Sequence, residues 1–288
     1  MPDLTPLYTL LAQLLPFEAM QARFMQQALA GLLLLTPMTA VMGILVVNFR
    51  MSFFADAISH SAFAGVALGL LFVLDPDWTM PAFGLVVGLG IMVMQRHSSL
   101  SSDTVIGVFF STMVAFGLAI VSRDRSLARD LQRFLYGDIL TISDDQVLAL
   151  FGLFLVVMAF LAISYNRLLY IGLNSTLAQA HRIRVAVLQY LFAGLLALIV
   201  MFAVQAVGVL LVTALLIVPA AAARNFARSA GSMFWWSLLV SLSSAVGGLL
   251  LSAQDWARTA TGATIILVAC LWFALSMVAA SLRGERSI

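Results

Sequence analysis

The stretch VAVLQYLFAGLLALIVMFAVQAVGVLLVTALLIVPAAAA, residues 185–223, carries no charged side chain over its whole length. A helix needs about 20 consecutive apolar residues to cross the hydrocarbon core of a bilayer, so this run is long enough for two crossings. It is interrupted only around Gln205 to Gly208, and we expect two helices joined by a tight turn there. If the interruption is instead a kink, the run forms a single crossing.

The whole chain has the composition of a membrane protein. Of its 288 residues, 62% are hydrophobic and 10% are charged, whereas soluble domains carry about 25% charged residues. Backbone groups in lipid must be satisfied within their own segment, so long apolar runs form helices there. The sequence therefore predicts an all-α polytopic transmembrane helix bundle of about eight or nine spans. The other apolar runs lie near residues 24–47, 52–74, 78–95, 104–122, 145–166, 232–252 and 261–281.

The N-terminus and the loops define the organisation of the chain. Residues 1–22 carry leucines at helical spacing, interrupted by Pro16, which predicts an amphipathic segment on the membrane surface; a loosely structured leader is the alternative. We expect no removable signal peptide, and residues 23–288 should form the transmembrane domain. The distribution of arginines favours an N-terminus outside and a cytoplasmic C-terminus. Residues 122–145 would then form a long outer loop. Residues 166–185 would form an inner loop that is large enough to bind a partner protein.

The chain lacks the common signatures of catalysis and of nucleic-acid binding. It has no G-x-x-x-x-G-K-[ST] phosphate loop, no H-E-x-x-H zinc motif and no G-x-S-x-G elbow. Its formal net charge is only +2 and its arginines are scattered, so nucleic acid is not an expected partner. The single cysteine, Cys270, can form no internal disulfide. We therefore expect neither an enzyme nor a permanently bound cofactor.

Two polar side chains stand in an otherwise apolar span. Asp56 and His60 are separated by one helical turn, so they share one face of the helix. A charge at the centre of a span costs about 2.5–3.5 kcal/mol on insertion scales, so Asp56 should face protein or water. The residues leave three interpretations open: a structural Asp–His hydrogen bond, a proton relay, or a pair of ligands for a transient divalent metal. Beside them, Ser61, Gly65 and Gly69 form a row of small residues that lets another helix approach closely.

Four segments, in the same order, resemble the ABC-3 family, the membrane permeases of bacterial zinc and manganese ABC importers. They are FRMSFFADAISHSAFAGVALG (49–69), SSDTVIGVFFSTMVAFGLAI (101–120), LQRFLYGDILTIS (131–143) and VQAVGVLLVTALLIVPAAAARNFA (204–227). The resemblance covers about residues 24–280. It implies a type II ABC importer-like permease in the bacterial cytoplasmic (inner) membrane.

The resemblance also implies an assembly and a site. A homodimer, formed with a second copy of the chain, would surround a central pathway. Cytoplasmic ATP-binding subunits would bind below it, and an extracytoplasmic metal-binding protein would deliver the ion from above. Asp56 and His60 would line the pathway as metal ligands or as a gate, with zinc as the first choice of cargo and manganese as the second. A stand-alone secondary transporter, driven by protons through the same two residues, is the alternative function.

The inner segment NSTLAQAHRI, which begins at Asn174, resembles the coupling loop D-x-E-x-A-x-x-x-G-[IV] of that family. Ala178 and Ile183 match the pattern, whereas Asn174 stands where an acid is usual and Arg182 where a glycine is usual. The resemblance implies that this loop contacts the ATP-binding subunit. We expect Leu177 and Ala178 to be exposed and to dock into that subunit.

Overall fold

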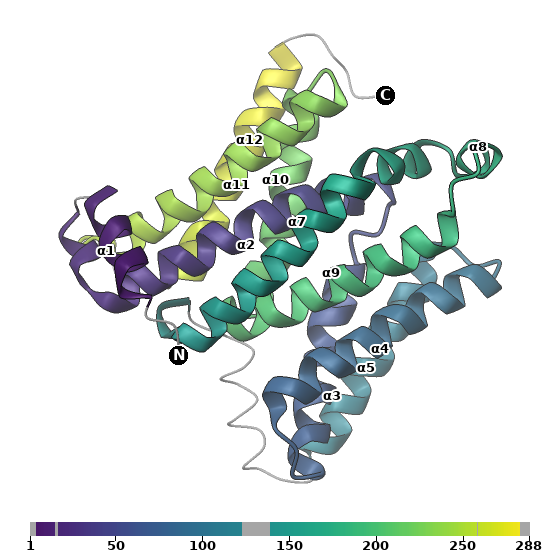
Figure 1. Cartoon of the computed structure of the whole chain (residues 1–288), viewed down its shortest axis with the longest axis horizontal. Helices are drawn as coiled ribbons and strands as arrows, with labels where there is room; N and C mark the ends of the chain where they lie inside the picture. The colour runs from purple at the N-terminus through teal and green to yellow at the C-terminus, as the bar shows by residue number, and fades with distance from the viewer. Residues whose placement is uncertain (1–3, 15–16, 123–138, 258, 283–288) are drawn as a thin grey trace. The chain divides into compact units, whose positions relative to one another are not determined.

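The computed structural model describes residues 4–14, 17–122, 139–257 and 259–282. In these ranges every regular element is helical, and nine helices are long and apolar enough to cross a membrane (Figure 1). The expected all-α, multi-span architecture is confirmed. The nine helices are α2 (Arg23–Asn48), α3 (Phe54–Leu71), α4 (Pro76–His97), α5 (Ser102–Val121), α7 (Asp144–Leu173), α9 (Val185–Val207), α10 (Val209–Phe226), α11 (Ala230–Ser252) and α12 (Thr261–Leu282). The shorter helices are α1 (Thr5–Leu14), η1 (Glu18–Gln21), η2 (Ile139–Thr141) and α8 (Ser175–Ala180).

The long apolar run of residues 185–223 forms two helices, as expected. Helix α9 ends at Val207 and α10 begins at Val209, and Gly208 between them has a φ of 83°. Glycine enters this left-handed region freely, whereas an L side chain there costs about 1–2 kcal/mol. Gly208 therefore allows the chain to end one helix and start the next without a longer loop.

Helix α7 is longer than its apolar segment predicts. The sequence places its end near residue 166, but the helix continues to Leu173. The additional turns bury Leu168 and Ile171. Burial of these apolar side chains favours continuing the helix past the polar Asn166 and Arg167. The prediction of an inner loop at residues 166–185 is therefore wrong for its first part, which is helical. The connection between α7 and α9 begins after Leu173 and contains α8. The outer loop expected at 122–145 lies mostly outside the described residues.

The chain divides into two compact units. Unit 1 comprises Met1–Ile44, Asp138–Val156 and Ala206–Ile288, and unit 2 comprises Leu45–Gly137 and Val157–Gln205. Helices α2 and α7 contribute residues to both.

Unit 1 is built on close contacts among α2, α10, α11 and α12. Helix α10 packs against α11 and α12, which lie side by side (Figure 1). The Ser237 hydroxyl donates to the Ala40 carbonyl (3.0 Å) and the Ser241 hydroxyl to the Thr36 carbonyl (3.3 Å), which joins α11 to α2. Both serines are fully buried, so these bonds remove the cost of an unpaired hydroxyl in an apolar interior.

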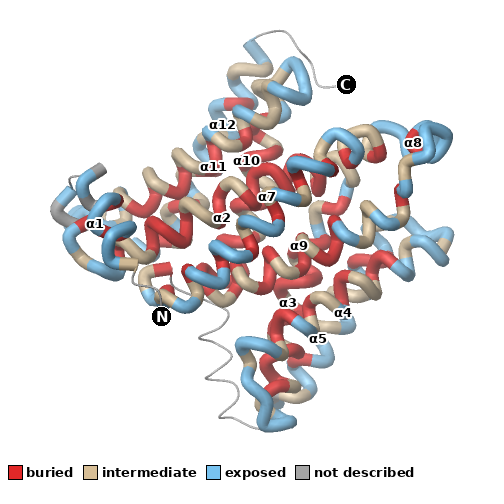
Figure 2. Tube along the Cα trace, viewed as in Figure 1, coloured by how far each residue is buried: buried red, intermediate tan, exposed pale blue. Residues whose placement is uncertain are grey.

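Unit 2 contains α3 packed between α4 and α5. A Cβ at Gly65 would lie 3.0 Å from the Met80 Cα, and a Cβ at Gly69 would overlap the Thr79 hydroxyl. The close helix approach predicted from this row of small residues is confirmed, with α4 as the neighbour. Figure 2 shows α3 buried along most of its length.

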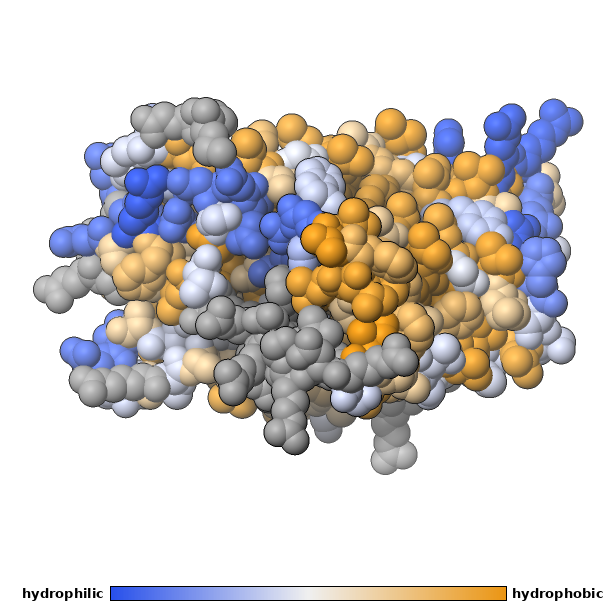
Figure 3. All heavy atoms as spheres, turned by 90° about the horizontal axis from the view of Figure 1, so that it is seen from below, coloured by the Kyte–Doolittle hydropathy of each residue, from blue (hydrophilic) through white to orange (hydrophobic). Residues whose placement is uncertain are grey.

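Large apolar areas lie on the face of the protein that Figure 3 shows, beside hydrophilic ones. Only 17% of the residues in the apolar windows of α5 and α12 are buried. These helix faces carry large apolar side chains such as Val108, Leu267 and Leu271 in exposed positions. In a bilayer such faces meet lipid or another apolar protein surface.

Replacing Gly43 by alanine should destabilise unit 1. The new methyl group would overlap the backbone carbonyl oxygen of Leu216 on α10, and overpacking of this kind costs about 1–3 kcal/mol in the free energy of unfolding. Gly247→Ala is the matched control, because its Cβ would meet nothing within 4 Å. Thermal melting of the purified protein in detergent measures both variants. If Gly43→Ala melts together with the wild type, α2 and α10 do not touch through their backbones at this point.

Candidate functional site

Asp56 and His60 lie in the first two turns of α3, in unit 2. Both are half-buried, while their neighbours Ala57, Ile58 and Ser59 are buried. The residue that precedes the helix, Phe53, offers no side-chain cap. The carboxylate of Asp56 in the first turn is favourable there, because the helix N-terminus carries a partial positive charge.

The His60 ring is held by the backbone of its own helix. Its Nδ1 lies 2.9 Å from the Asp56 carbonyl oxygen. A carbonyl oxygen only accepts, so Nδ1 is the nitrogen that donates the proton. In the neutral ring Nε2 then carries the free lone pair, which is the arrangement found in metal-binding histidines whose other nitrogen is hydrogen-bonded.

The His60 ring also contacts two aromatic side chains. The Phe110 ring of α5 meets it edge to face, with 4.9 Å between ring centroids and an interplanar angle of 67°. Phe63, almost one turn further along α3, lies 6.2 Å away. Sequence reasoning missed Phe110, since nothing in the spacing along the chain links α5 to this face of α3.

The structural Asp–His hydrogen bond considered from the sequence is not formed between the two side chains. His60 bonds the backbone carbonyl of Asp56, and none of the described residues donates a hydrogen bond to the Asp56 carboxylate. The carboxylate and Nε2 therefore remain available to a ligand. Among the described residues no group of three or more His, Cys, Asp or Glu side chains comes together, so this part of one chain offers at most two donors of this kind to a metal.

The second candidate segment is α8 with its flanking residues, also in unit 2 and at one end of α7 (Figure 1). The Asn174 side-chain oxygen accepts hydrogen bonds from the backbone N–H groups of Thr176 and Leu177, both at 3.0 Å. Asparagine and aspartate are about equally good N-caps. Asn174 therefore supplies the helix start that an acid at this position would supply.

Arg182, which stands where the family pattern has glycine, adopts a left-handed backbone conformation. Arg182 has a φ of 59°, and its N–H donates to the Gln179 carbonyl while the Ile183 N–H donates to the Ala178 carbonyl (2.9 and 3.1 Å). These bonds are the Schellman motif, in which glycine usually takes the left-handed position. The usual glycine thus has a conformational reason, and Arg182 adopts the same backbone at a cost of about 1–2 kcal/mol.

The two residues expected to dock into the ATP-binding subunit, Leu177 and Ala178, differ in their exposure. The Leu177 side chain is 50% exposed, but Ala178 is fully buried. The expectation that Ala178 is exposed is wrong: it lies on the inner face of this short helix, and Ile183 is only partly exposed. His97 and His181 are exposed, each with its Nδ1 against a backbone carbonyl in the preceding turn.

Comparisons with known proteins identify the family of the chain. The sequence model of the ABC 3 transport family matches residues 21–280. The high-affinity zinc uptake system membrane protein ZnuB of Haemophilus influenzae is 32% identical over 245 residues, 85% of this chain and 93% of the relative. The manganese import system permease protein ScaB of Streptococcus gordonii is 32% identical over 255 residues, 88% of this chain and 90% of the relative. The solved structure of PsaBC from Streptococcus pneumoniae in complex with Fab superimposes with a TM-score of 0.76 at 31% identity, over 88% of this chain and 91% of that chain.

The family match includes both the α3 pair and the α8 segment. It also takes in the whole of α2 to α11 and nearly all of α12. The resemblance seen in four short segments therefore extends over the complete set of candidate spans. This chain belongs to the ABC 3 transport family.

Proposed function

We propose that this chain is the membrane-spanning permease subunit of an ATP-binding-cassette importer. Its cargo would be a divalent transition metal, zinc first and manganese second, carried across the bacterial cytoplasmic membrane. The observation that carries the proposal is the α3 pair, in which the His60 Nε2 and the Asp56 carboxylate share one face of a span and form no hydrogen bond with any described residue. Membership in a transport family, with relatives named for zinc and for manganese, supports it. ATP hydrolysis is assigned to a separate subunit, so the chain itself is not an enzyme.

The small donor set supports the proposal that two copies of the chain form the site. Zinc in a closed protein site takes about four ligands, and one chain offers Asp56 and His60. A two-fold symmetric homodimer places the same surface of both copies face to face, which brings two imidazoles and two carboxylates to one point. Such a mixed nitrogen and oxygen set suits zinc and also accepts manganese. Because each half of the site belongs to a different subunit, a relative movement of the subunits opens it and releases the ion.

The topology that we propose follows from the arginine distribution. The N-terminus is outside and the C-terminus is cytoplasmic. With an odd number of spans the two termini lie on opposite sides, in agreement with the nine candidate spans of the described residues. In this orientation α8 faces the cytoplasm, where ATP-binding subunits would bind, and an extracytoplasmic metal-binding protein would deliver the ion to the opposite face.

Coupling to ATP hydrolysis is assigned to the α8 segment. Leu177 is its exposed apolar side chain, and it is the residue that we propose docks into the ATP-binding subunit. Asn174, Ala178 and Ile183 act indirectly, because they cap α8, fill its inner face and close its C-terminal end. A movement of the bound subunit would then reach the long helices through α7 and α9, which α8 connects.

Asp56→Asn and His60→Gln should each abolish most zinc uptake, because each replaces a carboxylate or imidazole donor by a neutral amide, a much weaker zinc ligand, with little change in shape. The expected loss is at least the roughly 10–100-fold that follows removal of an outer-shell partner of a metal ligand. His97→Gln is the matched control, since His97 makes the same Nδ1 contact to a backbone carbonyl (2.9 Å, to Val93) but is exposed at the end of α4. Zinc uptake by cells that carry the complete transporter measures all three variants.

Unchanged uptake in both α3 variants would contradict the assignment of the metal pathway. Uptake that needs a proton gradient but no ATP-binding subunit would instead identify a stand-alone secondary transporter. Equal amounts of purified permease dimer in wild type and variants show that neither substitution acts through assembly.

Leu177→Asp should weaken binding of the ATP-binding subunit, because it puts a charge in place of the exposed apolar side chain of α8. Burial of such a charge at an interface without a partner costs several kcal/mol. Gln179→Asp adds the same charge to the same helix at another exposed position and serves as the control. Co-purification of the permease with its ATP-binding subunit measures the difference. Equal losses in both variants would mean that Leu177 is not the docking residue.

A further inference from the structure

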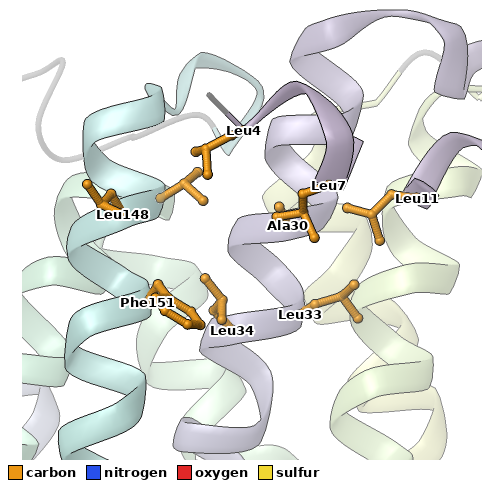
Figure 4. A pocket seen from close by; sticks show the side chains of 9 residues that line it. Leu4, Leu7, Leu11, Ala30, Leu33, Leu34, Leu148 and Phe151 are labelled. Carbon is orange, nitrogen blue, oxygen red and sulfur yellow. The ribbon is translucent and has the colours of Figure 1, made fainter. Parts of the chain in front are cut away.

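An apolar cavity lies in unit 1, between α1, α2 and α7 (Figure 4). Its volume is about 380 Å³, within the range of about 300–1,000 Å³ that is usual for ligand pockets. Every residue that lines it is Leu, Val, Ala or Phe. No lining side chain offers a hydrogen bond, so the cavity fits the hydrocarbon part of a molecule.

The same helix faces that line the cavity carry a polar cluster at one end. Leu4, just before α1, and Leu11 on α1 lie four residues before and three residues after Tyr8, so they lie on the same side as its ring. Ala30 lies two turns from Arg23 on α2, and Val147, Leu148 and Phe151 follow Asp144 on α7 in the same way. Tyr8, Arg23 and Asp144 therefore form a polar rim above an apolar cavity.

Hydrogen bonds to Asp144 hold this rim together. The Tyr8 hydroxyl donates to its Oδ1 (2.7 Å), as does the Gln27 amide (2.7 Å), and the Arg23 Nη2 donates to its Oδ2 (2.8 Å). Burial, reinforced by the hydrogen bond to Asp144, raises the pKa of Tyr8, so the phenol stays protonated and keeps donating. The rim fixes α1 against α2 and α7 and so keeps the cavity between them.

The Arg23 guanidinium has N–H donors that its ion pair with Asp144 does not use and that can bind an anion. Its side chain is 62% exposed, and a single nitrogen, Nη2, forms its ion pair with Asp144. A guanidinium has five N–H donors, and those not used for Asp144 can reach phosphate oxygens. The first residue of the cavity on α2, Ala30, is seven residues away, or about 10 Å along the helix axis. That is a spacing that a phosphate group and the upper part of its acyl chain can bridge.

The cavity is open to the outside of the protein, because part of its lining is exposed. Leu7, Leu148 and Phe151 line it and are nevertheless 45%, 41% and 47% exposed. A chain that enters from the bilayer therefore stays in contact with apolar groups throughout. A peptide segment is a poor occupant, because its backbone N–H and C=O groups would find no partner among the lining side chains.

We propose that this cavity binds one acyl chain of a bilayer phospholipid, whose phosphate is held by Arg23. The ligand is a structural lipid, bound independently of the Asp56/His60 pathway. It fills the space under α1 and completes the packing of that helix on α2 and α7.

Native mass spectrometry of the full-length protein in detergent, titrated with palmitoyl-oleoyl phosphatidylglycerol, tests the site. Wild type should retain one phospholipid per chain. Leu34→Trp and Leu148→Trp, which place an indole in the cavity, should weaken binding at least about tenfold, since loss of two buried methylenes already accounts for that factor. Leu267→Trp on the exposed face of α12 is the matched control and should bind as wild type does.

The phosphate contact is tested separately with palmitoyl-oleoyl glycerol, which has the same acyl chains and no phosphate. Arg23→Gln should weaken binding of the phospholipid about fivefold more than binding of the glycerolipid, whereas Arg23→Lys should retain most of the preference for the phospholipid. Thermal melting shows whether either cavity-filling variant, Leu34→Trp or Leu148→Trp, fails to fold. If one does, the lipid affinity of the other tests the proposal. Wild-type affinity in the folded filling variants, an equal loss in Leu267→Trp, or a retained detergent molecule in place of lipid would overturn the proposal.

Discussion

A backbone N–H or C=O group without a partner costs several kcal/mol in the hydrocarbon core of a bilayer, where water is absent. This constraint turns the long apolar runs of the chain into helices and requires that connections between them stay short or satisfy their own backbone. The α9–α10 turn consists of Gly208 alone, in a left-handed conformation. The C-terminal end of α8 is closed by a Schellman motif with Arg182 in the same region of φ.

The same constraint applies to polar side chains within the spans. Ser237 and Ser241 donate to carbonyl groups of a neighbouring helix, and His60 donates to a carbonyl of its own helix. For His60 the consequence is chemical as well as structural. Once Nδ1 is engaged by the Asp56 carbonyl, Nε2 is the nitrogen left for a metal, and Phe110 limits where the ring can turn. The backbone contact thus uses one ring nitrogen and leaves the other for the proposed metal.

The two sites differ in how they combine polar and apolar groups. At the α3 pair, two polar side chains stand among apolar ones, and in the proposed homodimer a second copy of the chain would complete the donor set. At the cavity under α1, the polar groups are gathered at a rim around Asp144 and the interior is wholly apolar. The first arrangement suits an ion in passage, and the second suits an amphipathic molecule that stays bound.

The sequence alone determined the fold class, a count of eight or nine spans, the place where the run of residues 185–223 is interrupted and the shared face of Asp56 and His60. Each depends on composition, or on spacing within one helix, which are local properties that the length of a lipid-crossing helix makes easy to interpret. The resemblance to the family also came from short linear segments. Tertiary structure decided the rest. It extended α7 to Leu173 by burying Leu168 and Ile171, turned Ala178 inward, set Phe110 against His60 and gathered three helices around a cavity. These features depend on contacts between residues far apart in the chain, and the spacing of residues along a single helix carries no information about which neighbour will pack against it.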